Sequence, residues 1–273
     1  MRQSDRSWIL GALGGFLLYF ASLQGATALT DSQKRQSDRF ALGNAVWILY
    51  HEIGHLLINE FQLPVLGREE DAVDHLATVT LLEGADEQMD GFLTDAVDGF
   101  FLSARMKRRK NTARQFFAGH GLDEQRAYEV ACLMLGNDKN AFFELAETIN
   151  LPADQRERCP SAYVLARSSW QAVLEPHTGG WLNRPSKDAV TFAYGNSSPA
   201  YARARAILAD AQVLEAAADF LGLKYVFPRQ IALRAEECGE ANAYFRPDDG
   251  EVVICYELVE EFRALLADYF KGL

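Results

Sequence analysis

The stretch "WILYHEIGHLLINEF", residues 47–61, decides how the rest of the sequence is interpreted. It belongs to a longer run, residues 40–60, in which apolar side chains recur at the spacing of a helix. On such a helix His51 and His55 are one turn apart and share a face. The sequence therefore predicts either a helix that offers two imidazoles to a metal ion or a buried helix with two ordinary histidines.

Two further residues of this stretch favour the metal. Glu52 directly follows the first histidine, where its carboxylate can take a proton from a water that the metal activates. Gly54 costs a helix interior roughly 1 kcal/mol relative to alanine, so its position predicts a close approach of another backbone. Only five histidines occur in the chain, so a chance HExxH motif is rare, on the order of 1%.

A catalytic zinc site needs a third protein ligand and one open position. A third histidine in the pattern HExxHxxGxxH is absent, because Ile58 and Phe61 occupy the relevant positions. The third ligand is therefore expected to be a carboxylate from the following segment, which excludes the class of site with three histidines.

The stretch "GREEDAVDHLA" supplies this carboxylate at the start of a second helix, expected over about residues 68–83. Glu70 and Asp74 are one turn apart, so Glu70 can ligate the metal while Asp74 holds a ligand histidine through its ring N–H. Glu69 and Asp71 are alternative ligands. Glu70 is preferred, because neither alternative leaves a second carboxylate one turn further on.

Four cysteines and the N-terminus indicate export. Arg2 and Arg6 precede an apolar run, residues 8–23, and "GATALT" carries small residues at Ala26 and Ala28. We expect a signal peptide over residues 1–28 and a mature protein in the periplasm or outside the cell. The alternatives are an uncleaved membrane anchor and a cytosolic protein with a buried N-terminal helix. An even number of cysteines without a C-x-x-C pair suggests two disulfides there, with four buried thiols as the alternative.

Closeness in sequence favours one particular pairing of the cysteines. The expected bonds are Cys132–Cys159 and Cys238–Cys255, because each pair lies within one apparent subregion. The composition otherwise excludes some partners. The formal net charge of −11 disfavours nucleic acid and anionic membrane surfaces, both of which repel an acidic protein. A membrane contact is expected only through an uncleaved N-terminal segment.

The remaining chain predicts an α+β fold that is mostly helical, with residues 29–273 as one domain. Residues 31–39 are expected to be a linker, residues 201–222 one alanine-rich helix, and residues 189–194 a weak strand or irregular chain. Three late runs, "QIALRAEE", "ANAYFRP" and "EVVICYEL", predict a small antiparallel sheet with a turn at residues 247–250. The predicted metal-binding helices and this sheet together suggest a zincin-like architecture.

The stretches "HEIGHLLI", "LPVLGREEDAVDHLA" and "ECGEANAYFRPDDGEVVICYEL" resemble the DUF4344 family, in which metallopeptidase activity is inferred from the motif. The resemblance implies a gluzincin-like peptidase, with HExxH plus glutamate, that binds one Zn²⁺. It implies that His51, His55 and Glu70 are the ligands and Glu52 the general base. It also supports a bond between the C-terminal cysteines.

The expected function is hydrolysis of peptide bonds in a peptide or protein substrate. One alternative is a non-catalytic, zincin-like binding protein of the cell envelope, in which the metal only stabilises the fold. Another is an envelope or interaction protein that needs no metal. An additional hydrogen-bond donor is expected near the reacting carbonyl, with His120 or Tyr256 as candidates. Asn242 and Tyr244 can contact substrate if the edge of the late hairpin faces the metal.

Overall fold

The computed structural model describes residues 28–84, 87–109, 121–180 and 184–272. Most of these residues are helical and one small sheet forms late in the chain, so the expected fold class is confirmed. The helices are α1 Asp31–Phe61, α2 Glu69–Glu83, α3 Glu87–Arg109, α4 Asp123–Asn137, α5 Lys139–Thr148, α6 Ala153–Arg156, α7 Cys159–Leu174, α8 Ala202–Asp210, α9 Val213–Lys224 and α10 Tyr256–Phe270, with short 3₁₀ turns η1 Glu175–His177 and η2 Lys187–Ala189.

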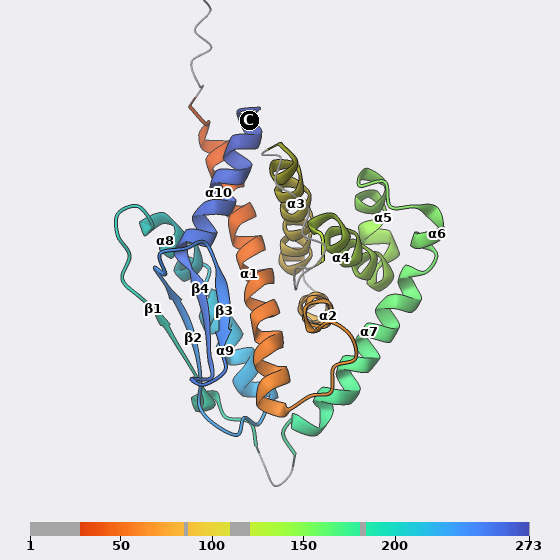
Figure 1. The fold of residues 1–273 in the computed structure, drawn as a ribbon, viewed down its shortest axis with the longest axis vertical. Helices are drawn as coiled ribbons and strands as arrows, with labels where there is room; N and C mark the ends of the chain where they lie inside the picture. Colours follow the sequence, from red (N-terminus) through yellow and green to blue (C-terminus); the bar gives the residue numbers. More distant parts are fainter. Residues whose placement is uncertain (1–27, 85–86, 110–120, 181–183, 273) are drawn as a thin grey trace, which may run out of the picture.

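Helix α1 runs through the centre of the molecule (Figure 1). The sheet lies on one side of it and the helices from α2 to α7 lie on the other, while α10 packs along its N-terminal half (Figure 1). Its buried residues are spread around the helix rather than confined to one stripe, as expected for a helix covered from several sides. This burial explains why residues 47–61 of α1 are so rich in apolar side chains.

The expected linker at residues 31–39 is wrong, because this segment is the first part of α1. Thr30 and Gln33 form a capping box: the Thr30 hydroxyl accepts the Gln33 N–H, and the Gln33 side chain accepts the Thr30 N–H. Two distant arginines, Arg203 and Arg263, donate to Asp38 and so fix this polar stretch from across the molecule. These partners are remote in sequence, so the segment alone resembles a linker.

In the described part of the chain, four strands form the sheet in the order β1-β2-β4-β3. They are β1 Val190–Tyr194, β2 Ile231–Glu236, β3 Ala243–Arg246 and β4 Glu251–Cys255. The hairpin of β3 and β4 is antiparallel, as expected, but β4 inserts between β3 and β2 and runs parallel to β2, which is parallel to β1. The sheet is therefore mixed rather than antiparallel, and β3 is an edge strand.

The expected alanine-rich helix over residues 201–222 is two helices, α8 and α9. Gln212 has a φ of 52°, in the left-handed region, and this backbone conformation interrupts the helix between α8 and α9. Alanine favours helix on both sides of the break, so propensity alone does not reveal it. Helix α9 packs on β1 and β2, whereas α8 packs against α10, α9 and α1.

Two disulfides are present, Cys132–Cys159 and Cys238–Cys255, so the expected pairing is confirmed. The first joins α4 to α7, and the second joins the loop after β2 to the end of β4. Disulfides of this kind are typical of proteins in an oxidising compartment outside the cytoplasm. Within the described ranges, no helix is both long and apolar enough to cross a membrane.

Candidate metal centre

Helices α1 and α2 come very close at Gly54. A Cβ atom at this position would lie 2.7 Å from Cβ of Val73 on α2, which is too close for any side chain. The close backbone approach expected from Gly54 is therefore confirmed. It brings the first turns of α2 against the face of α1 that carries the two histidines.

The Glu70 carboxylate converges with both imidazoles. Its Oε2 atom lies 3.3 Å from Nε2 of His51 and 3.6 Å from Nε2 of His55. The ligand atoms that these three residues can offer all lie within 4.8 Å of one another. Atoms that are each about 2.0–2.2 Å from one tetrahedral ion are about 3.3–3.6 Å apart. The spacing and the donor set, two nitrogens and one carboxylate, therefore fit a zinc ion.

Two other carboxylates orient the imidazoles. Oδ1 of Asp74 lies 2.7 Å from Nδ1 of His51, and Oε1 of Glu69 lies 2.7 Å from Nδ1 of His55. Each histidine is thus held at Nδ1, and its Nε2 atom points toward the shared position. The structure places Asp74 as the sequence suggested. It gives Glu69, considered there as an alternative ligand, the corresponding position beside the second histidine.

Burial and these carboxylates have opposite effects on the histidines. Burial by itself lowers the pKa of His51, but hydrogen bonds to Asp74 and Glu70 outweigh it and raise the pKa. For His55 burial also lowers the pKa, whereas hydrogen bonds to Glu70 and Glu69 raise it to about 9. The site is therefore rich in negative charge, which favours a cation between the imidazoles.

Arg126 on α4 completes the surroundings of Asp74. It donates from Nε to Oδ2 and from Nη2 to Oδ1, at 2.7 and 2.8 Å. Sequence reasoning missed this residue, because 52 positions separate it from Asp74 and a single arginine in a helix has no distinctive pattern. Only the packing of α4 on α2 brings the two residues together.

The candidate metal ligands open onto a groove of about 350 Å³. One wall comes from α1 and the start of α2, and the other comes from strand β3 and the turn that follows it. The lining residues are His51, Glu52, His55, Asn59, Glu69, Glu70, Ala243, Tyr244, Phe245 and Pro247. The expected base Glu52 is half-buried in this groove, on the same turn as His51 and His55. The edge strand therefore faces the candidate metal centre.

Other expected contributors lie elsewhere. His120 lies outside the described residues. Tyr256 is buried at the start of α10, where its hydroxyl donates to the carbonyl oxygen of Gly195, and it does not line the groove. Asn242 also stays outside the groove, and its side-chain oxygen accepts the N–H of Ala243. Of the described candidates for substrate contact, Tyr244 is the one in the groove wall.

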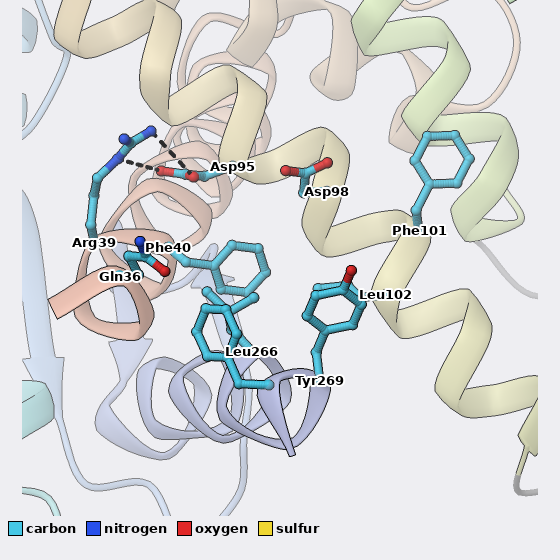
Figure 2. Close-up of a pocket in the computed structure, with 10 residues that line it drawn as sticks. Gln36, Arg39, Phe40, Asp95, Asp98, Phe101, Leu102, Leu266 and Tyr269 are labelled. Atoms are coloured by element: carbon cyan, nitrogen blue, oxygen red, sulfur yellow. Dashed lines mark hydrogen bonds and ion pairs between the residues drawn. The ribbon is translucent and has the colours of Figure 1, made fainter. Parts of the chain in front are cut away.

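A second cavity, of about 440 Å³, lies between α1, α3 and α10 (Figure 2). Asp95 and Asp98 of α3 line it, opposite aromatic and aliphatic side chains of α1 and α10. Arg39 is the cation drawn beside Asp95 in Figure 2. This cavity is separate from the groove of the candidate metal centre, with which it shares no lining residue.

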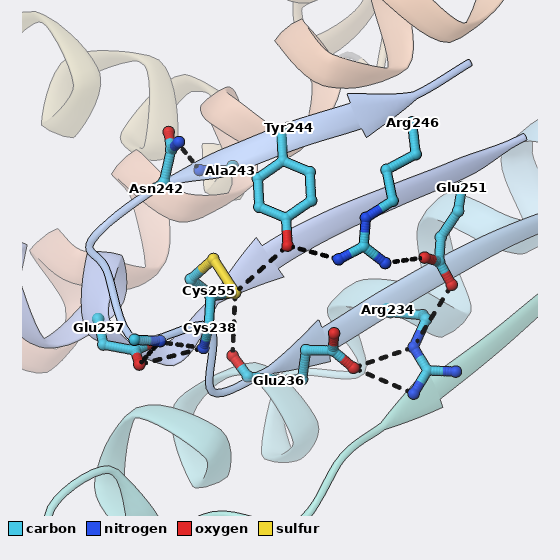
Figure 3. The surroundings of a disulfide bond; sticks show 11 residues. Arg234, Glu236, Cys238, Asn242, Ala243, Tyr244, Arg246, Glu251, Cys255 and Glu257 are labelled. Carbon is cyan, nitrogen blue, oxygen red and sulfur yellow. Dashed lines mark hydrogen bonds and ion pairs between the residues drawn. A yellow bond between two sulfur atoms is a disulfide. The ribbon is translucent and has the colours of Figure 1, made fainter. Parts of the chain in front are cut away.

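Strand β3 is fixed at its N-terminal end by a partly buried network (Figure 3). The Cys238–Cys255 disulfide ties the loop before β3 to the end of β4. The Glu257 carboxylate accepts the backbone N–H groups of Cys238 and Gly239 in the same loop. Further along β3, Arg246 donates to the Tyr244 hydroxyl at 2.7 Å (Figure 3).

The C-terminal end of β3 is fixed by Arg229. This side chain donates to the carbonyl oxygens of Pro247 and Asp248 and to the buried carboxylate of Glu60 on α1. The turn after β3 is thereby attached to the helix that carries the histidines. Both ends of the edge strand are thus held in place beside the candidate metal centre.

Together these features define a mostly helical α+β protein with a His-His-Glu site that can hold a metal ion. The chain belongs to the DUF4344 family, described as "Putative metallopeptidase", whose model matches residues 18–174 and 195–272. The match confirms the resemblance seen in the sequence motifs. Comparison with curated proteins and with solved structures found no match.

Proposed function

We propose that the chain is an exported zinc-dependent peptidase in which His51, His55 and Glu70 hold one zinc ion. The observation that carries this proposal is the convergence of two Nε2 atoms and one carboxylate oxygen at the spacing of a tetrahedral site. Membership of a family described as metallopeptidases supports the same conclusion. Two disulfides support export, and residues 1–28 would act as the signal peptide.

Zinc at this site would supply a Lewis acid that polarises the peptide carbonyl and acidifies water. Glu52 is the residue placed to move protons. Its carboxylate accepts a proton from the attacking water as the new C–O bond forms, and it delivers this proton to the amine as the C–N bond breaks. The half-buried position of Glu52 beside both histidines supports this role.

The edge strand supports a peptide as the substrate. Among the described residues, strand β3 pairs only with β4, so its other edge can accept an extended chain. An extended peptide can add to such an edge through backbone hydrogen bonds. Because β3 lines the groove of the candidate metal centre, a peptide bound there would have its carbonyl groups near Glu52. The proposed substrate is therefore an unfolded or extended segment of a protein.

The test is digestion of a peptide library by the purified protein, with and without a chelator. The variant Glu52→Gln should retain one zinc ion and lose nearly all hydrolysis, by about 10²-fold or more. The matched control is Glu144→Gln on the exposed side of α5, which should retain full activity. Full activity of Glu52→Gln would contradict the proposal. Bound zinc without any hydrolysis by the wild type would instead support a binding protein that zinc stabilises.

A further inference from the structure

We infer that Arg126 is a positioning residue for the metal centre, acting on His51 through Asp74. This inference rests on the proposed zinc site and extends it to a residue outside the ligand set. One atom, Oδ1 of Asp74, connects Arg126 to His51. Oδ1 of Asp74 accepts from Nη2 of Arg126 at 2.8 Å and lies 2.7 Å from Nδ1 of His51. Any rotation of the Asp74 carboxylate therefore changes both contacts.

The two-point contact fixes the plane of the carboxylate. Nε of Arg126 holds Oδ2 at 2.7 Å while Nη2 holds Oδ1, so neither oxygen can turn away. Such paired N–H···O bonds constrain geometry as well as contributing energy. A lysine in the same place could supply a charge but not this geometry.

Arg126 is itself held rigidly. Its guanidinium carbon lies 4.6 Å from the ring centre of Phe100 on α3 and 5.3 Å from that of Trp47 on α1. Trp47 donates to the Thr78 hydroxyl, which donates to the backbone carbonyl of Asp74. The guanidinium is therefore packed among four helices, and Trp47 lies one turn before His51 on the same helix.

Burial makes the contact of Arg126 with Asp74 important. The side chain of Asp74 is 4% exposed and that of Arg126 is 14% exposed. A buried carboxylate needs hydrogen-bond donors for its oxygens, and Arg126 supplies one to each oxygen of Asp74. Without Arg126, Oδ2 of Asp74 would lose its donor and the carboxylate would be free to turn away from His51.

Two roles for Arg126 predict opposite changes in zinc affinity. If Arg126 acted only as a nearby positive charge, its removal would strengthen zinc binding, because two cations repel. If it positions Asp74 and His51, its removal should weaken zinc binding by about 10–100-fold, as is typical for partners that orient metal ligands. The sign of the change therefore distinguishes the two roles.

The test measures the zinc dissociation constant by competition with a chromogenic chelator. Arg126→Ala should bind zinc about 10–100-fold more weakly than the wild type, and Arg126→Lys should recover only part of this loss. In protein loaded with Co²⁺, Arg126→Ala should also shift the absorption bands that report ligand geometry. The control Arg167→Ala removes an exposed ion pair with Glu83 on the surface and should leave both measurements unchanged.

A double variant tests whether the effect passes through Asp74. In the Asp74→Asn background, adding Arg126→Ala should change zinc affinity by less than about threefold, because the shared path is already broken. If Arg126→Ala alone does not fold, Arg126→Lys and the double variant decide the question. Unchanged or stronger zinc binding by folded Arg126 variants would overturn the inference and leave the proposed function intact. A wild type without zinc would instead overturn both.

Discussion

Helix α1 meets α2 and α3 at two points along its length, and each neighbour brings one buried aspartate to the contact. Asp74 of α2 lies against His51 and Arg126, at distances of 2.7 to 2.8 Å. Asp95 of α3 has only Arg39 as a cationic partner among the described residues, at 3.3 to 3.4 Å. The two contacts therefore differ in how fully they compensate a buried charge.

The pKa values of Asp74 and Asp95 reflect this difference between the two contacts. Burial raises the pKa of both carboxyl groups, but the partners of Asp74 reverse the effect. For Asp95, burial outweighs the attraction of Arg39, and the nearby Asp98 raises the pKa further, to about 7. Arg39 is 63% exposed, so water screens much of its attraction. The comparison indicates that the α2 contact is arranged to keep a buried anion, and this is the contact that supports the candidate metal centre.

Glycines make both contacts possible and allow the two to be compared directly. A Cβ at Gly54 would meet Val73 of α2 at 2.7 Å, and a Cβ at Gly43 would meet Asp95 of α3 at 2.7 Å. Each substitution to alanine should lower the free energy of unfolding by about 1–3 kcal/mol, because the helices must separate. Only Gly54→Ala should also weaken zinc binding, since it moves Glu70 away from the histidines of α1.

Thermal unfolding and zinc titration check this pair of variants. Gly180→Ala is the control, because no atom of the described residues beyond its chain neighbours lies within 4 Å of the added methyl group, and its stability should be nearly unchanged. If Gly43→Ala weakened zinc binding as much as Gly54→Ala, the metal centre would depend on the whole helix layer rather than on the α2 contact.

Replacing the carboxyl group at position 95 should have a smaller effect, and one that depends on pH. The folded state raises the pKa of Asp95 from the ordinary 3.8 to about 7, so it binds the proton more tightly than the unfolded chain. Stability from this group is therefore full below about pH 4 and falls as the pH rises to about 7. Asp95→Asn should raise the free energy of unfolding at pH 8 by about 1–3 kcal/mol and change it little at pH 4.

Urea unfolding at several pH values checks this expectation. Asp210→Asn is the control, because this residue is exposed at the end of α8 and its replacement should leave the stability nearly unchanged. A loss of stability in Asp95→Asn at pH 8 would mean that the ion pair with Arg39 outweighs burial, and the contrast between the two aspartates would not hold.

The sequence predicts the ligand helices because their evidence is local. The spacing of His51 and His55 and of Glu70 and Asp74 places each pair on one helix face, and Gly54 indicates the close approach between the helices. The nearest-neighbour pairing of cysteines and the turn before β4 are local in the same sense.

The local sequence could not predict the structural features that depend on partners remote in the chain. The N-terminal part of α1 is fixed by Arg203 and Arg263, which are 165 and 225 positions from Asp38. The insertion of β4 beside β2 gives the mixed sheet, although strand patterns alone do not reveal strand order. Arg126 reaches Asp74 only through helix packing. In each case the deciding contact arises from tertiary structure.

The most direct test of the metal centre compares two adjacent glutamates. Zinc dissociation constants should be measured for the wild type, Glu70→Gln and Glu69→Gln, together with the number of zinc ions per chain. The wild type should hold one ion. Glu69→Gln, which alters only the residue at Nδ1 of His55, should bind zinc about 10–100-fold more weakly. Glu70→Gln removes the proposed carboxylate ligand and should lose considerably more affinity. An equal or greater loss in Glu69→Gln, or a wild type without stoichiometric zinc, would contradict the assignment of His51, His55 and Glu70 as the metal ligands.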